Sequence, residues 1–148
     1  MSKRRVVVTG LGVVSPVGIG VKTAWDNIIA GKSGITQITK FDTSAFASTI
    51  AGEVKDFNVE DYLSAKDARR MDTFIQYGLV AAMEAVKDSG IVTTEENAER
   101  IGVSIGSGIG GMQYIEDTDI LYQASGPRKI SPFFIPGNIR PFKAVHNR

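Results

Sequence analysis

The sequence predicts an α/β fold in which helices pack on a sheet, and three observations lead to this prediction. Predicted strands and helices alternate along the chain, which is the order of layered α/β proteins. Residues 6–9 form a continuous β-branched run, typical of a strand buried on both faces. Residues 72–90 read as a helix that is apolar almost all round, and such a helix is expected inside a larger body. The sheet looks incomplete, because few strands accompany so apolar a helix.

The composition bounds the class of protein. The chain has 148 residues, 43% of them hydrophobic, and a formal net charge of +1. These values predict a folded globular protein that is neither disordered nor generally basic, so no nucleic-acid partner is expected. No apolar run approaches the ~20 residues of a membrane span, and the N-terminus lacks a signal-peptide core. We therefore expect a cytoplasmic protein without a membrane partner.

The chain contains no cysteine and one histidine. This content excludes disulfides, thiolate metal sites and a cysteine nucleophile within the sequence. We accordingly predict no metal site.

The first part of the chain is predicted to combine turns with short elements. A helix is expected over residues 21–30, ended by Gly31. We expect a loop over residues 36–48 and a short strand over residues 49–54. The large apolar residues of the helix fall on one side: Trp25, Ile28 and Ile29.

The middle of the chain carries the clearest helix signals. Residues 64–67 resemble a capping box, which predicts a short basic helix over the residues that follow. Asp72 begins the long apolar helix, and Gly90 closes it.

A glycine-rich turn is the most informative stretch. Residues 101–105 alternate as a short strand, and residues 106–111 then hold five glycines or serines around one large side chain, Ile109. Glycine accepts positive φ and lets other atoms approach the backbone closely, so we expect something to lie near Ile109. A helix is predicted over residues 112–123.

Two alternatives compete for this turn. It matches the dinucleotide pattern G-x-G-x-x-G, but the acidic residue expected about 20 positions later is absent from residues 127–132. The other alternative is a tight turn that only packs a helix onto a sheet. The glycines of the turn that match the dinucleotide pattern are Gly106, Gly108 and Gly111.

A second segment resembles a nucleotide-binding motif. Residues 31–33 resemble the end of a P-loop, yet Asp26 occupies the position of its first glycine.

Six segments together resemble the N-terminal part of the β-ketoacyl-acyl-carrier-protein synthase II family, condensing enzymes of the thiolase-like fold. They occur in the family's order and spacing over residues 1 to about 139. The segments are residues 4–12, 15–18, 41–45, 71–78, 105–111 and 126–136.

The resemblance implies a fold and a reaction. The fold is a partial thiolase-like domain over residues 1–139, the N-terminal part of a layered α/β/α/β/α core. The family elongates fatty acids by condensing an acyl group, held on a cysteine, with malonyl-carrier protein, and it loses carbon dioxide. Two histidines stabilise the developing oxyanions. The implied partners are acyl and malonyl forms of acyl carrier protein and a second copy of the chain, with no external cofactor.

The sequence departs from the family near its end. The family cysteine follows soon after residues 133–134 and the histidines much later, so no catalytic residue is predicted here. His146 lies in a tail, residues 140–148, that does not match the family. We interpret the tail as a truncation or a frame change near Asn138. The chain by itself is expected to be inactive.

By resemblance, four residues line the acyl pocket. They are Gly108, Ile109, Met112 and Phe134, and Phe134 is expected to reach across a two-fold dimer. Gly108 would let the acyl chain pass close to the backbone. The competing interpretation for Ile109 and Met112 is ordinary core packing.

Five cations resemble the family's docking patch for the acidic carrier protein. Lys66, Arg69 and Arg70 share a helix face, and Arg128 and Lys129 form a second cluster. Complementary charge would steer the encounter and make it sensitive to salt. The competing interpretations are a solvated face with no partner and, for the whole chain, a non-catalytic carrier-binding or dimerisation module.

Overall fold

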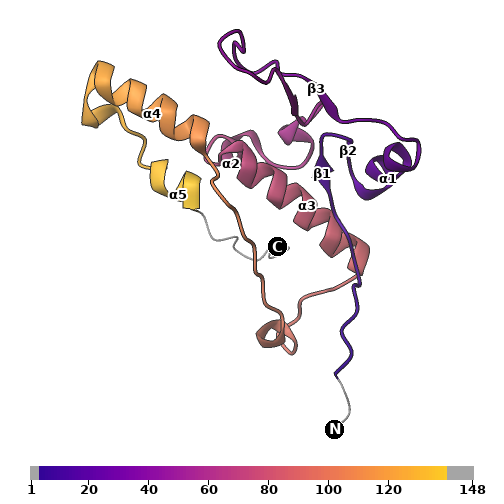
Figure 1. Ribbon diagram of the computed structural model, residues 1–148. Coiled ribbons are helices and arrows are strands. Elements are labelled where there is room, and N and C mark those ends of the chain that lie inside the picture. Colours follow the sequence, from indigo (N-terminus) through magenta and orange to yellow (C-terminus); the bar gives the residue numbers. More distant parts are fainter. Residues whose placement is uncertain (1–3, 140–148) are drawn as a thin grey trace. The chain divides into compact units, whose positions relative to one another are not determined.

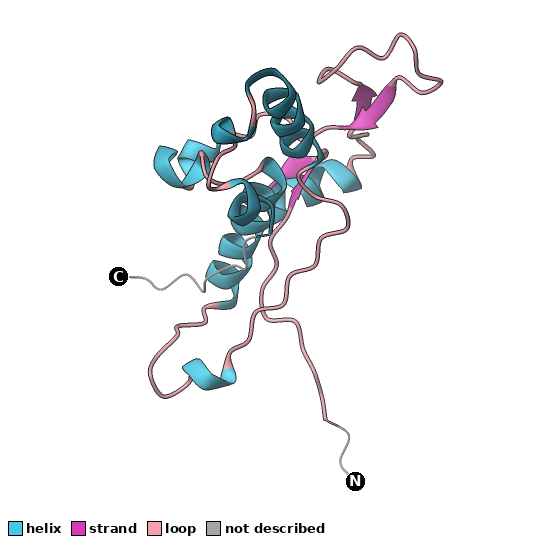
Figure 2. Cartoon of the chain, turned by 90° about the vertical axis from the view of Figure 1, so that its left-hand side faces the viewer, coloured by secondary structure: helices cyan, strands magenta, loops and turns pink. Residues whose placement is uncertain are grey.

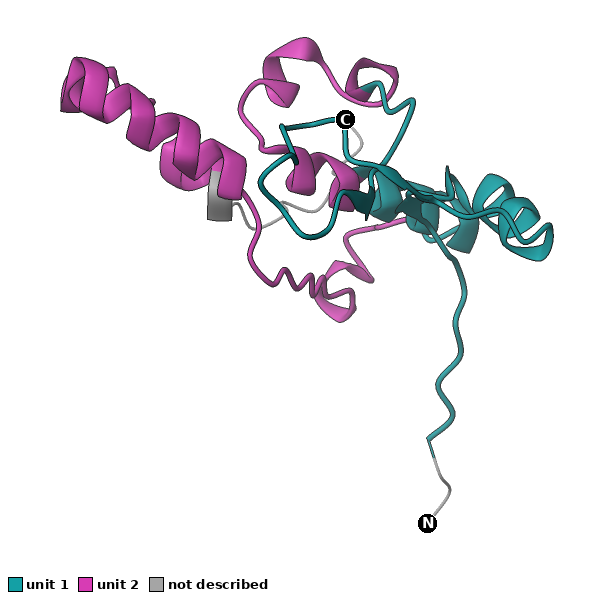
Figure 3. Ribbon diagram, turned by 45° about the horizontal axis from the view of Figure 1, so that its top comes forward, with its two compact units in different colours: residues 1–58, 80–91 teal, residues 59–79, 92–148 magenta. Residues whose placement is uncertain are grey.

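The structure is a computed structural model that describes residues 4–139. The predicted tail and His146 lie outside the described residues, so the predicted boundary at residue 139 stays a prediction. The chain divides into two compact units: residues 1–58 with 80–91, and residues 59–79 with 92–148 (Figure 3).

The first unit contains two short antiparallel ribbons and a helix (Figure 1). Strands β1 (Val14–Ser15) and β2 (Gly18–Ile19) pair with Val14 opposite Ile19. Strands β3 (Ile35–Gln37) and β4 (Ile50–Gly52) pair with Ile35 opposite Gly52. The strand predicted near residue 50 is confirmed, whereas β3 occupies the start of a segment predicted to be a loop.

Helix α1 (Val21–Ile29) confirms the first predicted helix. Ala24 is its buried residue, while Trp25 is 60% exposed and Ile28 and Ile29 are exposed beside it. The predicted apolar side therefore exists, and within the described residues it remains largely uncovered.

Helix α3 (Thr73–Ser89) is the long helix that the sequence predicts. Ile75 and Val80 are its buried apolar residues, at 5% and 4% exposure. Most of its other apolar side chains are half-buried and Val86 is exposed, so the expectation of a helix buried all round is only partly met.

The N-terminal segment packs directly on the C-terminal half of α3. A Cβ at Gly10 or Gly12 would collide with the backbone carbonyls of Ala85 and Ala81, respectively. The two backbones therefore approach at van der Waals distance, which only glycine permits.

Carboxylates of α3 bind backbone donors in the same segment. The amide of Val13 donates to Glu84 Oε2 at 3.0 Å, and the amide of Val21 donates to Glu84 Oε1 at 2.8 Å. The amide of Leu11 donates to Asp88 Oδ2 at 2.9 Å. Glu84 thus joins the β1–β2 ribbon and the start of α1 to α3.

Two predicted strands are not formed in the part of the chain that the structure describes. Residues 6–9 and 101–105 are extended but unpaired, and Val6 is 87% exposed. A strand requires neighbours for its backbone donors and acceptors, and no described segment supplies them. The sequence pattern shows that these segments are apolar and β-branched, but it does not show which strand would pair with them.

Among its described residues the second unit contains helices and loops but no strand, and Figure 2 shows the helices of the chain in cyan. Ser64 caps α2 (Ala65–Ala68), with its Oγ accepting from the amide of Asp67 at 3.1 Å, which confirms the predicted cap. Helix α4 (Met112–Ser125) confirms the predicted helix after the glycine turn. The remaining elements are α5 (Phe134–Ile139) and three short 3₁₀ helices, η1 (Val59–Asp61), η2 (Ala98–Arg100) and η3 (Pro127–Lys129).

None of the helices in residues 4–139 has both the length and the hydropathy that are needed to cross a membrane.

We predict that Glu84→Gln destabilises the first unit. An amide offers one acceptor oxygen where the carboxylate offers two, so one of the two backbone donors loses its partner. The expected loss is about 1–3 kcal/mol in the free energy of unfolding, measured by urea denaturation and followed by the fluorescence of Trp25. Exposed Glu95→Gln is the matched control and should change stability by less than about 0.5 kcal/mol. Equal midpoints for the two variants would contradict the proposed role of Glu84.

A second prediction concerns Glu53 at the end of the β3–β4 ribbon. The hydroxyl of Thr39 donates to Glu53 Oε2 at 2.7 Å and its amide to Oε1 at 3.1 Å. These hydrogen bonds hold the pKa of Glu53 below its usual value. The stabilisation is present above the usual pKa and is lost as the pH falls through the lowered pKa of the folded state.

Nuclear magnetic resonance titration of the Glu53 carboxyl measures this effect. Thr39→Val removes the hydroxyl donor and should raise the pKa of Glu53 towards its usual value. An unchanged Glu53 pKa in this variant would show that Thr39 is not the cause.

Candidate functional site

Every predicted site residue belongs to the second unit. The cations lie around α2 and η3, and the predicted acyl-pocket residues lie at the glycine turn, the start of α4 and the start of α5. The site can therefore be described within one unit.

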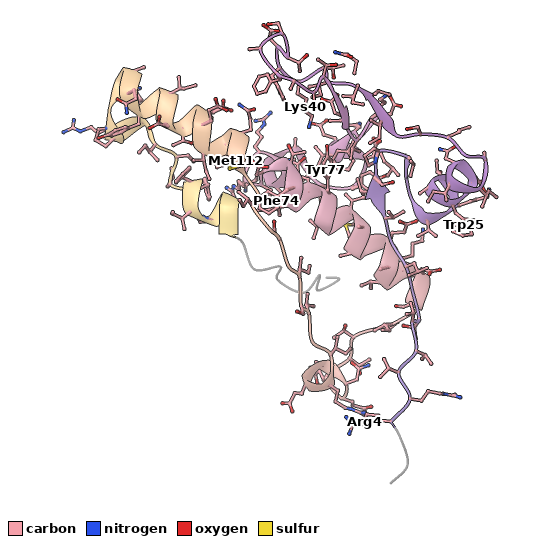
Figure 4. The ribbon with its side chains drawn as sticks, in the orientation of Figure 1. Arg4, Trp25, Lys40, Phe74, Tyr77 and Met112 are labelled. Atoms are coloured by element: carbon pink, nitrogen blue, oxygen red, sulfur yellow. The ribbon has the colours of Figure 1, made fainter. Side chains whose placement is uncertain are left out.

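The last two glycines of the turn are required by internal packing. A Cβ at Gly110 would lie 2.6 Å from the ring of Phe74 on α3. Gly111 is buried, has φ 73° and caps the N-terminus of α4. These contacts set the start of α4 beside the start of α3, and Figure 4 shows Met112 and Phe74 at these two helix starts.

The earlier glycines of the turn have no such role. A Cβ at Gly106 or Gly108 would meet no protein atom within 4 Å. Ile109 is 83% exposed and Met112 is 63% exposed. Core packing of these two side chains is thus not observed in the described part of the chain. The turn instead presents open backbone next to two exposed apolar side chains.

An aromatic pair lies where α4 meets α5. The rings of Tyr114 and Phe134 have centroids 5.6 Å apart and are tilted by 51°. A Cβ at Gly137 would lie 3.3 Å from the Tyr114 ring, so glycine allows α5 to approach α4 closely. Phe134, the predicted pocket residue, is therefore half-buried against α4.

The predicted cations divide into two clusters. Lys66 and Arg69 are exposed on α2 and its C-terminal cap, whereas Arg70 is half-buried. Arg128 and Lys129 are exposed in η3, which follows the C-terminus of α4. The clusters lie at opposite ends of α4 (Figure 1), a helix of 14 residues and hence about 20 Å long. One partner would have to span this distance to touch both.

Four residues that contact this site were not among the predicted site residues: Phe74, Gly110, Tyr114 and Phe133. The guanidinium of Arg70 lies over the ring of Phe133, 4.7 Å from its centroid. The ring of Tyr114 packs against that of Phe134, and Gly110 lies against the ring of Phe74. Their partners come from distant segments: Arg70 for Phe133 and Phe134 for Tyr114. Nothing in the local pattern identifies such partners.

Comparison with known proteins identifies the family of this chain. Residues 3–144 match the family described as Beta-ketoacyl synthase, N-terminal domain. The chain belongs to this family. The 3-oxoacyl-acyl-carrier-protein synthase 2 of Vibrio cholerae serotype O1 is 56% identical over 139 residues, which are 94% of this chain and 34% of that protein. This β-ketoacyl synthase domain thus spans about a third of the length of the curated relatives it matches.

Solved structures support the same assignment. The ishigamide ketosynthase/chain length factor superposes with a TM-score of 0.74 at 31% identity, covering 93% of this chain and 34% of that one. A ketosynthase in complex with the acyl-carrier protein of a type II PKS superposes with a TM-score of 0.68 at 25% identity, covering 91% of this chain and 35% of that one. The predicted partial thiolase-like α/β fold and the predicted family are confirmed.

The dinucleotide alternative receives no support. Its fingerprint requires a strand before the glycines, and in the described residues none forms there. The tight-turn alternative, a helix packed onto a sheet, is not what the turn shows: Gly110 lies against Phe74 of helix α3, and a Cβ at Gly106 or Gly108 of this β-ketoacyl synthase turn would meet no atom within 4 Å.

We predict opposite tolerance at two glycines of the turn. Gly110→Ala places a methyl group inside the contact distance of Phe74 and should cost about 1–3 kcal/mol of stability. Gly108→Ala enters open space and should change stability by less than about 1 kcal/mol. Thermal and urea unfolding of the two variants measure the difference. Equal losses would show that the Gly110–Phe74 contact does not hold α4.

Proposed function

We propose that this chain forms the acyl-binding wall and the carrier-docking surface of a 3-oxoacyl-acyl-carrier-protein synthase that elongates fatty acids. The similarity of the Vibrio cholerae enzyme over nearly the whole chain supports the activity class. The observation that carries the proposal is the glycine turn. It leaves Ile109 and Met112 exposed beside backbone that has no side-chain cover.

The turn has the properties that an acyl chain requires. Exposed apolar side chains offer surface that an alkyl chain can bury at about 25 cal/mol per Å². Met112 is unbranched and adapts its shape to a moving tail. Gly108 leaves room for the chain beside the backbone, and Phe134 supplies an aromatic wall supported by Tyr114.

The condensation itself requires groups that this chain does not contain. A thiolate must hold the acyl group and attack through it, and the sequence has no cysteine. We therefore propose that these residues bind and orient the substrate and that the chain alone does not catalyse the condensation. No cofactor is proposed, and the cytoplasm is the proposed compartment.

Acyl carrier protein is the proposed macromolecular partner, in its acyl and malonyl forms, and a homodimer is the proposed assembly. Support for the partner comes from the structural neighbour whose ketosynthase is in complex with an acyl-carrier protein. The exposed cations Lys66, Arg69, Arg128 and Lys129 suit an acidic surface. Exposed charges of this kind raise the rate of encounter more than they fix affinity.

The second candidate function is a non-catalytic module that docks carrier protein or pairs with a complete subunit. Its support is the set of exposed cations Lys66, Arg69, Arg128 and Lys129, because docking requires no nucleophile. The two candidates share the docking surface, and they differ in whether the acyl group contributes to binding.

We predict that the chain binds acylated carrier protein more tightly than unacylated carrier protein. Lys66→Glu combined with Arg69→Glu should weaken binding of both forms by about tenfold, equivalent to about 1.4 kcal/mol, and added salt should weaken it in the wild type. Ile109→Asp should remove only the preference for the acylated form. Titration by calorimetry measures both effects.

Lys87→Glu combined with Lys32→Glu, two exposed positions outside the α2 cluster, is the control that changes the net charge by the same amount. If it weakens binding as much as the α2 variant, the docking surface is wrongly placed. If acylation makes no difference to the wild type, the acyl-wall function is wrong and the docking module remains.

A further inference from the structure

Arg70 differs from the other cations of the α2 cluster. Its guanidinium lies over the ring of Phe133, with Cζ 4.7 Å from the ring centroid. It is half-buried, whereas Lys66 and Arg69 are exposed. A cation in this position is attracted by the ring quadrupole. Arg70 therefore has a partner within the chain.

The backbone fixes the same contact from the other side. The amide of Asp72 donates to the carbonyl of Gly137 at 3.3 Å, and the amide of Gly137 donates to the carbonyl of Phe133 at 2.7 Å. A Cβ at Gly137 would lie 3.2 Å from the carbonyl oxygen of Arg70. The turn between α2 and α3 is thus joined to α5 by its backbone and by one side chain.

The residue after Phe133 is the proposed acyl-wall residue. Phe134 packs on Tyr114 with ring centroids 5.6 Å apart. Phe133 and Phe134 share a peptide unit at the start of α5, so a contact that holds the backbone at Phe133 also limits the backbone from which the ring of Phe134 projects. The contact of Arg70 with Phe133 and the placement of Phe134 are therefore linked by one peptide unit.

The chemistry of arginine makes this arrangement more than a packing contact. A guanidinium stacks on an aromatic ring through its face and donates hydrogen bonds through its edge. A carboxylate can bind the edge while the ring occupies the face. Lysine carries a compact charge without these two separate surfaces.

We propose that Arg70 is a positioning residue that holds the Phe133–Phe134 segment in place and couples a carboxylate bound at its edge to the placement of Phe134. This inference rests on the proposed function for the identity of Phe134 as an acyl wall and of acyl carrier protein as the acidic partner. Because coupling is reciprocal, a partner that orders Arg70 also orders Phe134.

The placement of Phe134 can be measured without a partner. We would label the phenylalanines of the full chain with 4-fluorophenylalanine and assign the fluorine resonances of Phe133 and Phe134 through their leucine variants. Arg70→Lys keeps the charge but loses the planar face, and it should shift or broaden the Phe134 resonance. Arg69→Lys is the matched control at the neighbouring exposed position and should leave that resonance unchanged. An unshifted Phe134 resonance in Arg70→Lys would overturn the proposal.

Variants at Phe133 test the same contact with Arg70 intact. Phe133→Leu removes the ring face and should reproduce the effect of Arg70→Lys on Phe134, whereas Phe133→Tyr keeps the face and should restore the wild-type resonance. If leucine and tyrosine at this position have the same effect, the cation–π contact is not what positions Phe134.

The coupling is tested by adding unacylated acyl carrier protein to the labelled chain. The proposal expects the Phe134 resonance to shift in the wild type and to shift far less in Arg70→Lys. Equal shifts in both proteins would overturn the coupling. Failure of the proposed function has a different signature: the α2 charge-reversal variant would bind carrier protein as well as the wild type, whatever the effect of Arg70→Lys on the resonance of the free chain.

Discussion

Backbone atoms of Gly10 and Gly12 lie directly against helix α3, with no room for a side chain between them. In the second unit Gly110 lies against a side chain of the same helix, the ring of Phe74, again with no room for a Cβ. In each unit a glycine brings a neighbouring segment to contact distance with its part of α3. The positions of the β1–β2 ribbon in one unit and of α4 in the other follow from these approaches, because a larger residue would displace the segment.

Close packing of backbone creates a second requirement, since buried donors must find acceptors. In the first unit Glu84 and Asp88 accept from the amides of Leu11, Val13 and Val21. In the second unit the amide of Asp72 finds the carbonyl of Gly137, and Gln76 donates to the carbonyls of Ala68 and Met71 at 3.1 Å. Side chains of helices thus complete hydrogen bonding that no strand pairing supplies in the described segments.

The difference between local signals and contacts with distant segments explains which features could be predicted from sequence. The helices at α1, α3 and α4 were predictable because period, caps and closing glycines are local signals, and the cap at Ser64 was predicted to the residue. Residues 6–9 and 101–105 were predicted as strands from equally local signals, but strand formation depends on distant neighbours. The site residues are predicted from the resemblance alone, and their exposure or burial follows only from the structure. The contact of Arg70 with Phe133 joins segments more than sixty residues apart, so no local pattern could reveal it.

The arrangement separates recognition from chemistry. An acyl carrier protein offers two things to a condensing enzyme, an acidic surface and an apolar chain, and the proposed site meets each with different side chains. Lys66 and Arg69 face solvent and suit the surface, while Ile109, Met112 and Phe134 suit the chain. Neither task requires a nucleophile, so a segment without cysteine can retain both. In the proposed site Arg70 would serve both tasks, because its guanidinium edge is available to a carboxylate while its face lies over the ring of Phe133, the residue next to the proposed aromatic wall. Binding energy from a remote contact can in this way order the group that receives the acyl chain, which is how enzymes use contacts far from the reacting atoms.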